Sequence, residues 1–215
     1  MINVAISGAS GSILGIRLIE ELLKAGKPVS CVLSETAKKI IEYEVLENAE
    51  PFTKMSALLK KRNASFDKGL LLDKSLLFDE SLLREFQNDD FFAPMASGSS
   101  KFEAVIVIPC SMKTLSSIVN GYADCLIARM CDVAIKEKRK CLIVPRETPL
   151  SVIHTRNLHR AATCGMEIVM PVPGFYTRPK TVDDIIDFII GKILNLLDIE
   201  HTLFKSWEYH DKKTL

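Results

Sequence analysis

The chain has 215 residues, which predicts a single domain that buries roughly 70% of the surface its unfolded chain would expose. Its formal net charge of +1 excludes the strongly basic surface of a nucleic-acid-binding protein or of a protein held on an anionic membrane. Although 47% of the residues are hydrophobic, the chain has no uncharged run of about 18 residues. We therefore expect neither a signal peptide nor a membrane span.

The chain opens with two strands that alternate with two helices. Residues 2–6 and 29–33 are short apolar runs without polar alternation, which suits strands covered on both faces. Helices are expected over residues 12–25, closed by Gly26, and over residues 35–46, headed by Ser34. This βαβα opening predicts right-handed crossovers and an α/β fold with a doubly wound parallel sheet.

Residues 47–103 are less regular, mixing leucine-rich pieces with charge. We expect a long connection with short helices or an extra strand, serving as a lid or as a contact between subunits. No change in composition is sharp enough to mark a second domain.

The second half of the chain repeats the alternation of strands and helices. Apolar runs at residues 104–108, 141–144 and 168–170 predict strands, and helices are expected over residues 124–136 and 156–164. A last helix begins after Thr181, where a capping box is expected, and has one continuous apolar stripe.

Four of the strands end abruptly in turns that carry chemically useful side chains. These turns follow residues 6, 108, 144 and 170, and they contain hydroxyl groups, a lysine, an Arg–Glu pair and a tyrosine. Ligands of parallel α/β sheets bind outside the carboxyl ends of the strands. The turns therefore mark the expected site.

Two of these turns and Ser34 are suited to bind a phosphate. Each can also be explained without a ligand, as a tight turn or as a helix cap. The turn at residues 7–11 leads into a helix, where free N–H groups and the helix dipole favour an anion, yet a tight turn alone is an equal alternative. Ser34 and the turn at residues 111–114 can likewise be simple helix caps. Their expected proximity at one edge of the sheet favours a phosphate or flavin pocket.

Arg146 and Glu147 lie between Pro145 and Pro149, directly after a buried strand. A rigid turn that holds a guanidinium beside a carboxylate is hard to explain by packing. Arginine suits bidentate contact with a phosphate or a flavin carbonyl, and glutamate can move a proton. Tyr176 follows the last strand, and its hydroxyl needs a partner.

Neither a metal site nor a disulfide framework is expected. The six cysteines have no CxxC spacing, and several lie in apolar runs, which is typical of reduced and buried thiols in a cytoplasmic protein. The four histidines have no metal spacing, and no nucleophile-elbow turn supports a triad hydrolase.

Taken together, these segments resemble the UbiX family of flavin prenyltransferases. The resemblance covers most of residues 2–197, in the family's order, through residues 7–11, 96–99, 109–111, 113–115, 132–134, 136–137, 145–150 and 173–176. It implies a flavodoxin-like fold over residues 1–197 and a tail, residues 198–215, that covers the site or a neighbouring subunit. It also implies a homo-oligomer, a dodecamer in characterised members, with the prenyl site built where subunits meet.

The resemblance further implies that the protein binds FMN and dimethylallyl monophosphate and makes prenylated FMN for UbiD-type decarboxylases. The family's FMN-binding positions correspond here to Gly8, Ala9, Ser10, Ser34, Ser111, Met112, Lys113, Thr114 and Arg146. Positions around the dimethylallyl phosphate correspond to Lys136, Glu147 and Tyr176, while Glu44 and Arg129 match an acidic and a basic residue near the flavin. We expect Glu147 to move protons and Lys136 to bind the departing phosphate, and we count Glu44 with them as catalytic.

The resemblance also implies that three further positions lie around the prenyl group and its phosphate. Lys192 stands where the family usually has arginine, which keeps the charge but loses the bidentate fork. Phe91 replaces a tryptophan of some members, and Trp207 lies in the tail, where the family often has an aromatic residue covering the site.

Two other functions compete with this interpretation. FMN-dependent decarboxylases of the phosphopantothenoylcysteine or lantibiotic type share the fold but carry an active-site histidine on an early helix, and none follows Ser34 here. A flavin-binding electron carrier is usually strongly acidic, which the net charge of +1 contradicts.

Overall fold

The computed structural model describes the chain except for residues 48, 67–78 and 206–215. Its residues form two compact units, residues 1–170 and residues from 171 onward. The expected domain boundary at residue 197 stays a prediction. Within the described residues, no helix is both long and apolar enough to cross a membrane.

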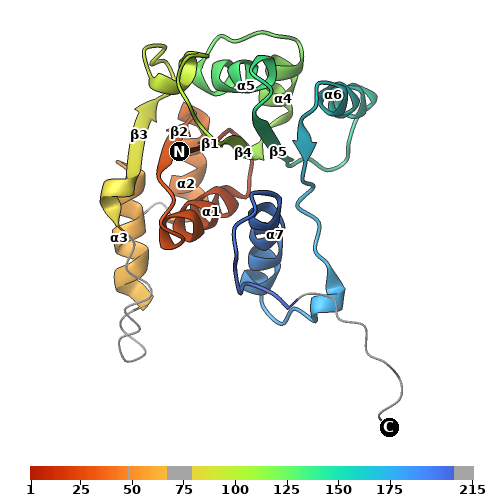
Figure 1. Cartoon of the computed structure of the whole chain (residues 1–215). Helices are drawn as coiled ribbons and strands as arrows, with labels where there is room; N and C mark the ends of the chain where they lie inside the picture. The colour runs from red at the N-terminus through yellow and green to blue at the C-terminus, as the bar shows by residue number, and fades with distance from the viewer. Residues whose placement is uncertain (48, 67–78, 206–215) are drawn as a thin grey trace. The chain divides into compact units, whose positions relative to one another are not determined.

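The first unit is built on a parallel sheet whose strand order is β3-β2-β1-β4-β5-β6 (Figure 1). The strands are β1 (Ile2–Ile6), β2 (Val29–Leu33), β3 (Leu83–Gln87), β4 (Ala104–Cys110), β5 (Lys140–Pro145) and β6 (Glu167–Ile168). The order reverses between β1 and β4, as in doubly wound folds, and without the edge strand β3 it is the flavodoxin-like order. The predicted fold class is confirmed.

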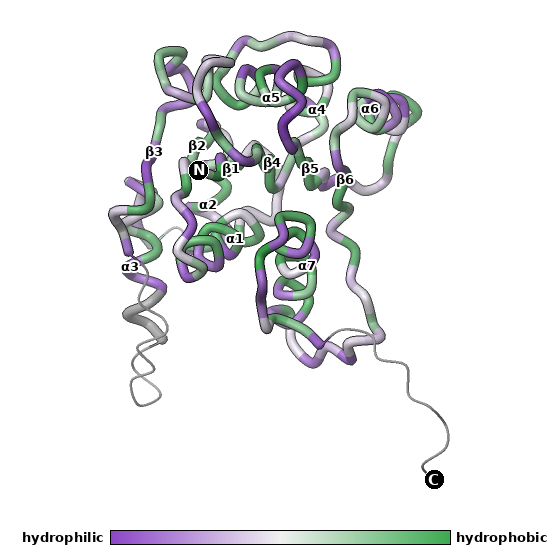
Figure 2. Tube along the Cα trace, in the orientation of Figure 1, coloured by the Kyte–Doolittle hydropathy of each residue, from purple (hydrophilic) through white to green (hydrophobic). Residues whose placement is uncertain are grey.

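Helices cover both faces of this sheet. One side carries α1 (Ser12–Lys24), α2 (Glu35–Glu44) and α3 (Met55–Phe66), and the other carries α4 (Met112–Val119), α5 (Leu126–Lys136) and α6 (Val152–Thr163) (Figure 1). Burial on both faces explains why β1, β2 and β4 are buried along their whole length and are mostly apolar, with Asn3 and Ser30 as buried polar residues. The edge strand β3 carries hydrophilic residues instead, as Figure 2 shows.

The irregular segment at residues 47–103 contains a helix and a strand, as expected. Helix α3 is tied to the edge strand because the Glu85 carboxylate accepts hydrogen bonds from the Met55 and Ser56 N–H groups at 2.7 and 3.1 Å. On its other side, Arg62 of α3 donates to the buried Glu20 of α1 at 2.7 Å. These charged contacts hold α3 against the edge strand β3 and against α1.

Two element boundaries differ from the sequence expectation. Helix α6 begins at Val152 rather than residue 156, because Ser151 and His154 form a capping box that the usual Glu or Gln signature does not reveal. Strand β6 ends at Ile168 instead of residue 170. The Val169 N–H still donates to the Ile143 carbonyl at 2.9 Å, and the prolines at 171 and 173 have no N–H to continue the pairing.

The second unit contains α7 (Val182–Leu196), which begins at the predicted capping box: Thr181 accepts from the Asp184 N–H, and Asp184 accepts from the Thr181 N–H. A short 3-10 helix, Phe175–Thr177, precedes it.

The cysteines are free thiols, as expected. Cys31, Cys110, Cys131 and Cys141 are buried, Cys125 is half-buried and Cys164 is exposed.

Candidate functional site

The turns after β1 and β4 are joined by one buried serine at the point where the strand order reverses. The Ser7 hydroxyl donates to the Pro109 carbonyl at 2.9 Å and accepts from the Ser111 N–H at 2.8 Å. A serine with both hydrogen-bond functions used inside the protein is a structural link. It sets the spacing of two predicted flavin-binding turns.

Neighbouring turns complete this carboxyl edge of the sheet. The Ser34 N–H donates to the Ile6 carbonyl at 3.1 Å, and the Arg146 N–H donates to the Cys110 carbonyl at 3.2 Å. The Arg146 side chain then reaches across to the Ser10 carbonyl at 3.2 Å. The turns after β1, β2, β4 and β5 therefore meet, which the order of the sheet decides and a linear sequence does not show.

The turn at residues 7–11 is packed closely against α2. A β-carbon added at Gly8 would lie 2.8 Å from the Thr36 side chain, so only glycine allows this approach. Ala9 is buried and Ser10 is exposed. The turn thus presents its backbone and the Ser10 side chain at the edge.

Ser34 and Ser111 are both helix caps. The Ser34 hydroxyl accepts from the Ala37 N–H at 3.1 Å, and the Ser111 hydroxyl accepts from the Thr114 N–H at 3.2 Å while donating to the Thr114 hydroxyl at 3.0 Å. Lys113 is exposed beside them, whereas the Met112 side chain packs in the core. Since α1, α2 and α4 all start at this edge, the positive ends of three helix dipoles converge there.

Glu44 makes contacts that the sequence did not reveal. Its carboxylate accepts from the Gly11 N–H at 3.0 Å, from the Ser12 N–H at 3.1 Å and from the Ser12 hydroxyl at 2.9 Å. Partial burial raises the pKa of Glu44, but hydrogen bonds from Ser10, Ser12 and the Gly11 N–H outweigh it and lower the pKa below its usual value. An ionised carboxylate therefore occupies the N-terminus of α1.

Glu147 lies next to Arg146 in the turn after β5. It is half-buried, and its carboxylate accepts a hydrogen bond from the Thr148 N–H at 3.2 Å. One carboxylate oxygen thus has a fixed backbone partner, which orients the side chain at the edge of the sheet. This position suits proton transfer to a molecule bound there.

Lys136 lies at the amino edge of the same sheet, at the opposite end of the strands from Glu147. It ends α5, and strand β5 then runs from Lys140 to Pro145 before Glu147. Six extended residues span roughly 20 Å, so the two predicted catalytic groups lie far apart within one chain. The Lys136 ammonium pairs with Glu137 at 2.6 Å.

Phe91 lies in the segment that connects β3 to β4, and Arg129 of α5 contacts the same segment. Arg129 donates to the Ala96 carbonyl at 3.0 Å and to Asp132 at 2.7 Å, so its guanidinium already has two partners. The Phe91 ring is 46% exposed and available for contact.

In the second unit, Phe188 brings together two predicted substrate residues. The Tyr176 and Phe188 rings meet edge to face with centroids 5.7 Å apart, and the Lys192 ammonium lies 5.9 Å from the Phe188 centroid. The Phe204 ring is 6.0 Å from the same ammonium. Sequence reasoning missed Phe188 and Phe204, which looked like ordinary apolar positions. Trp207 lies outside the described residues.

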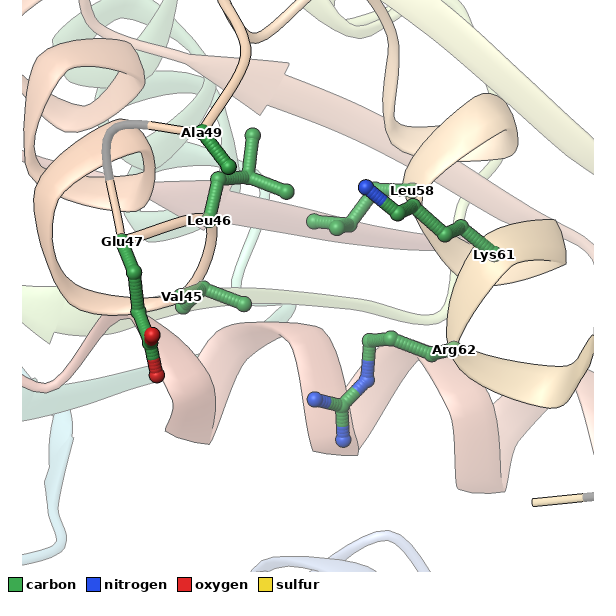
Figure 3. A pocket seen from close by; sticks show the side chains of 7 residues that line it. All are labelled: Val45, Leu46, Glu47, Ala49, Leu58, Lys61 and Arg62. Atoms are coloured by element: carbon green, nitrogen blue, oxygen red, sulfur yellow. The ribbon is translucent and has the colours of Figure 1, made fainter. Parts of the chain in front are cut away.

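A separate cavity of about 290 Å³ is found between the end of α2 and α3 (Figure 3). Its lining residues are Val45, Leu46, Glu47, Ala49, Leu58, Lys61 and Arg62. No predicted site residue is among them, so it is distinct from the carboxyl-edge site. Within the described parts of the chain, no cluster of three or more metal-ligating side chains occurs.

Comparison with known proteins agrees with this arrangement. The family model described as Flavoprotein matches residues 1–194. A flavin prenyltransferase UbiX of Methanocaldococcus jannaschii is 42% identical over 206 residues, covering 96% of this chain and 97% of its own length. The length and level of this identity exceed what a shared fold alone produces.

Comparison with solved structures points to the same family. The structure of AnUbiX in complex with FMN and dimethylallyl pyrophosphate superposes with a TM-score of 0.80 at 33% identity, covering 98% of both chains. A dodecameric FMN-dependent UbiX-like decarboxylase from Escherichia coli has a TM-score of 0.77 at 34% identity, covering 97% of this chain and all of its own. The expected resemblance is confirmed: this chain belongs to the UbiX family of flavin prenyltransferases.

Proposed function

We propose that this protein transfers the dimethylallyl group of dimethylallyl monophosphate to N5 and C6 of reduced FMN. The observation that carries the proposal is the meeting of the turns after β1, β2, β4 and β5, with three helix N-termini aimed at one edge of the sheet. The prenylated FMN then passes to a UbiD-type decarboxylase in the cytoplasm.

The polar groups at the carboxyl edge of the sheet are suited to bind FMN. The hydroxyl-bearing turns at Ser10, Ser34 and Ser111–Thr114 would hold the phosphate and ribityl chain, and Arg146 would contact a flavin carbonyl. Because Glu44 already occupies the α1 N-terminus, the phosphate belongs with the starts of α2 and α4. Reduced FMN supplies the two atoms that receive the prenyl group.

The prenyl donor needs a site for a leaving phosphate and a wall for an allyl cation. Breaking the allylic C–O bond leaves both, so cationic groups must face the phosphate while aromatic rings face the cation. Lys136, Arg129, Lys192 and the Tyr176 hydroxyl would bind the phosphate, and Phe91 and Trp207 would flank the cation. Glu147 would move the proton released when the new ring closes.

These groups require more than one copy of the chain. Lys136 and Glu147 lie at opposite edges of one sheet, so a single chain does not bring both to one substrate. We infer that the amino edge of one subunit meets the carboxyl edge of another in a homo-oligomer, as a dodecamer would allow.

The test is to incubate the protein with reduced FMN and either dimethylallyl monophosphate or the pyrophosphate, and to weigh the flavin product. We expect prenylated FMN, formed faster from the monophosphate. The variant Glu147→Gln keeps the shape but cannot titrate, and should slow single-turnover product formation roughly 100-fold while FMN binding is unchanged. An unmodified flavin mass from the wild-type protein would refute the proposal, and a fully active Glu147→Gln would remove Glu147 from the mechanism.

A further inference from the structure

The short turn at residues 97–100 is held by an arginine that no predicted role uses. Arg139 donates from Nη2 to the Gly98 carbonyl at 2.7 Å and from Nη1 to the Ser100 carbonyl. Its guanidinium also stacks over Phe102, with Cζ 4.3 Å from the ring centroid. One planar group thus fixes two carbonyls and one aromatic ring, which an ammonium cannot do.

The rest of this turn, which we call the serine turn (residues 97–100), is internally ordered. The Ser97 and Ser99 hydroxyls lie 2.8 Å apart, and the Ser100 N–H donates to the Ser97 carbonyl at 3.3 Å. Just before it, the Ala96 carbonyl accepts from Arg129 at 3.0 Å. The two arginines therefore hold three carbonyls of one short segment, those of Ala96, Gly98 and Ser100.

Gly98 of the serine turn lies directly against Lys136. A β-carbon built on Gly98 would be 2.7 Å from the Lys136 ammonium and 2.4 Å from a Glu137 carboxylate oxygen. The ammonium and its carboxylate partner, 2.6 Å apart, thus pack on the bare backbone of Gly98. The position of the serine turn therefore determines the position of the Lys136 ammonium.

We propose that Arg139 is a positioning residue: by holding the serine turn it sets the place of the Lys136 ammonium, and through it the affinity for the phosphate of the prenyl donor. This inference rests on the proposed role of Lys136. Arg139 itself, with its donors directed at the two carbonyls, does not need to touch the substrate.

Steady-state kinetics test the inference. Arg139→Lys keeps the charge but loses the planar fork, and should raise KM for dimethylallyl monophosphate about tenfold, with kcat and FMN affinity unchanged. Gly98→Ala leaves Arg139 in place and displaces only the ends of two flexible side chains, Lys136 and Glu137, so it should raise the same KM while the fold is kept. Arg160→Lys is the matched control, because the Arg160 side chain donates only to the Asn120 side chain, at 2.6 Å, among the hydrogen bonds described.

A double variant separates positioning from general damage to the fold. In a Lys136→Met background, Arg139→Lys should raise KM no further, since the group it positions is gone. A full additional effect in that background, or an unchanged KM in Arg139→Lys alone, would overturn the inference. If Lys136→Met itself leaves KM unchanged, the role of Lys136 and this inference both fail.

A second measurement decides the inference even if the wild-type protein forms no prenylated flavin. The acylation rate of Lys136 by acetic anhydride, read by peptide mass spectrometry, should rise several-fold in Arg139→Lys, while that of Lys113 stays constant. An inactive wild type with this change in reactivity would refute the proposed function alone. An unchanged rate at Lys136 would overturn the positioning role.

Discussion

At the scale of single residues, the site contains more internal contacts than the side-chain types suggested. Ser7 uses its hydroxyl twice to join the turns after β1 and β4. Glu44, expected beside the flavin, accepts hydrogen bonds from the start of α1. The catalytic role of Glu44 stays a prediction. Its contact with the start of α1 can be tested by measuring the stability of the protein as a function of pH.

The pKa of Glu44 in the folded protein lies below the ordinary value of 4.5, so the carboxylate stabilises the folded state above that pH. This contribution is lost as the pH falls through the lowered pKa. Glu44→Gln should therefore cost about 1 kcal/mol of unfolding free energy near neutral pH and progressively less in acid. Thermal unfolding of both proteins across this range measures it, and a difference independent of pH would contradict the ionised contact.

At the scale of elements, a serine at the start of a helix serves equally as a cap and as part of a phosphate site. Ser34 and Ser111 do cap α2 and α4 through the Ala37 and Thr114 N–H groups. A cap uses one N–H group, while other N–H groups of the first turn have no partner inside the helix. Capping and phosphate binding are therefore compatible.

Ser34→Asp separates these two functions. Aspartate caps helices as well as serine does, so the unfolding temperature should stay nearly constant. Its negative charge would face the FMN phosphate, and FMN affinity should fall at least roughly tenfold. Riboflavin, which has no phosphate, is the internal control in the same titration. An equal loss for both ligands, or no loss for either, would place the phosphate elsewhere.

At the scale of the whole molecule, the sheet separates residues that act together in the proposed reaction. Lys136 precedes β5 and Glu147 follows it, at opposite edges. Exposed apolar side chains, including Phe92 at 100% and Val152 at 73%, also leave surface for contact between subunits. Both observations favour an assembly in which one site uses two chains.

Co-expression of Lys136→Met and Glu147→Gln chains tests this assembly. At a donor concentration well below KM each variant alone should be strongly impaired, Lys136→Met through weaker binding of the donor phosphate and Glu147→Gln through slower proton transfer. Mixed oligomers should regain activity, because about a quarter of sites formed between random neighbours combine two intact edges. Light scattering should report a large homo-oligomer for every preparation. A mixture as inactive as its parents would show that the two groups do not meet across subunits.

The sequence by itself determined the fold class, the central strands and which residues form the turns after them. Apolar runs without alternation belong to strands covered on both faces, and this local signal needs no tertiary information. The strands at residues 2–6 and 29–33 and the capping box at Thr181 are confirmed for that reason. The family resemblance, carried by short segments in a fixed order, is confirmed as well.

Only the tertiary structure decided which of these residues are neighbours. Contacts such as Glu44 with the α1 N-terminus, Arg139 with the Gly98 carbonyl and Tyr176 with Phe188 join positions that share no local pattern. The distance between Lys136 and Glu147 depends on the direction of one strand, although they are close in sequence. Side-chain type follows from the sequence, whereas proximity follows from the order and direction of the strands.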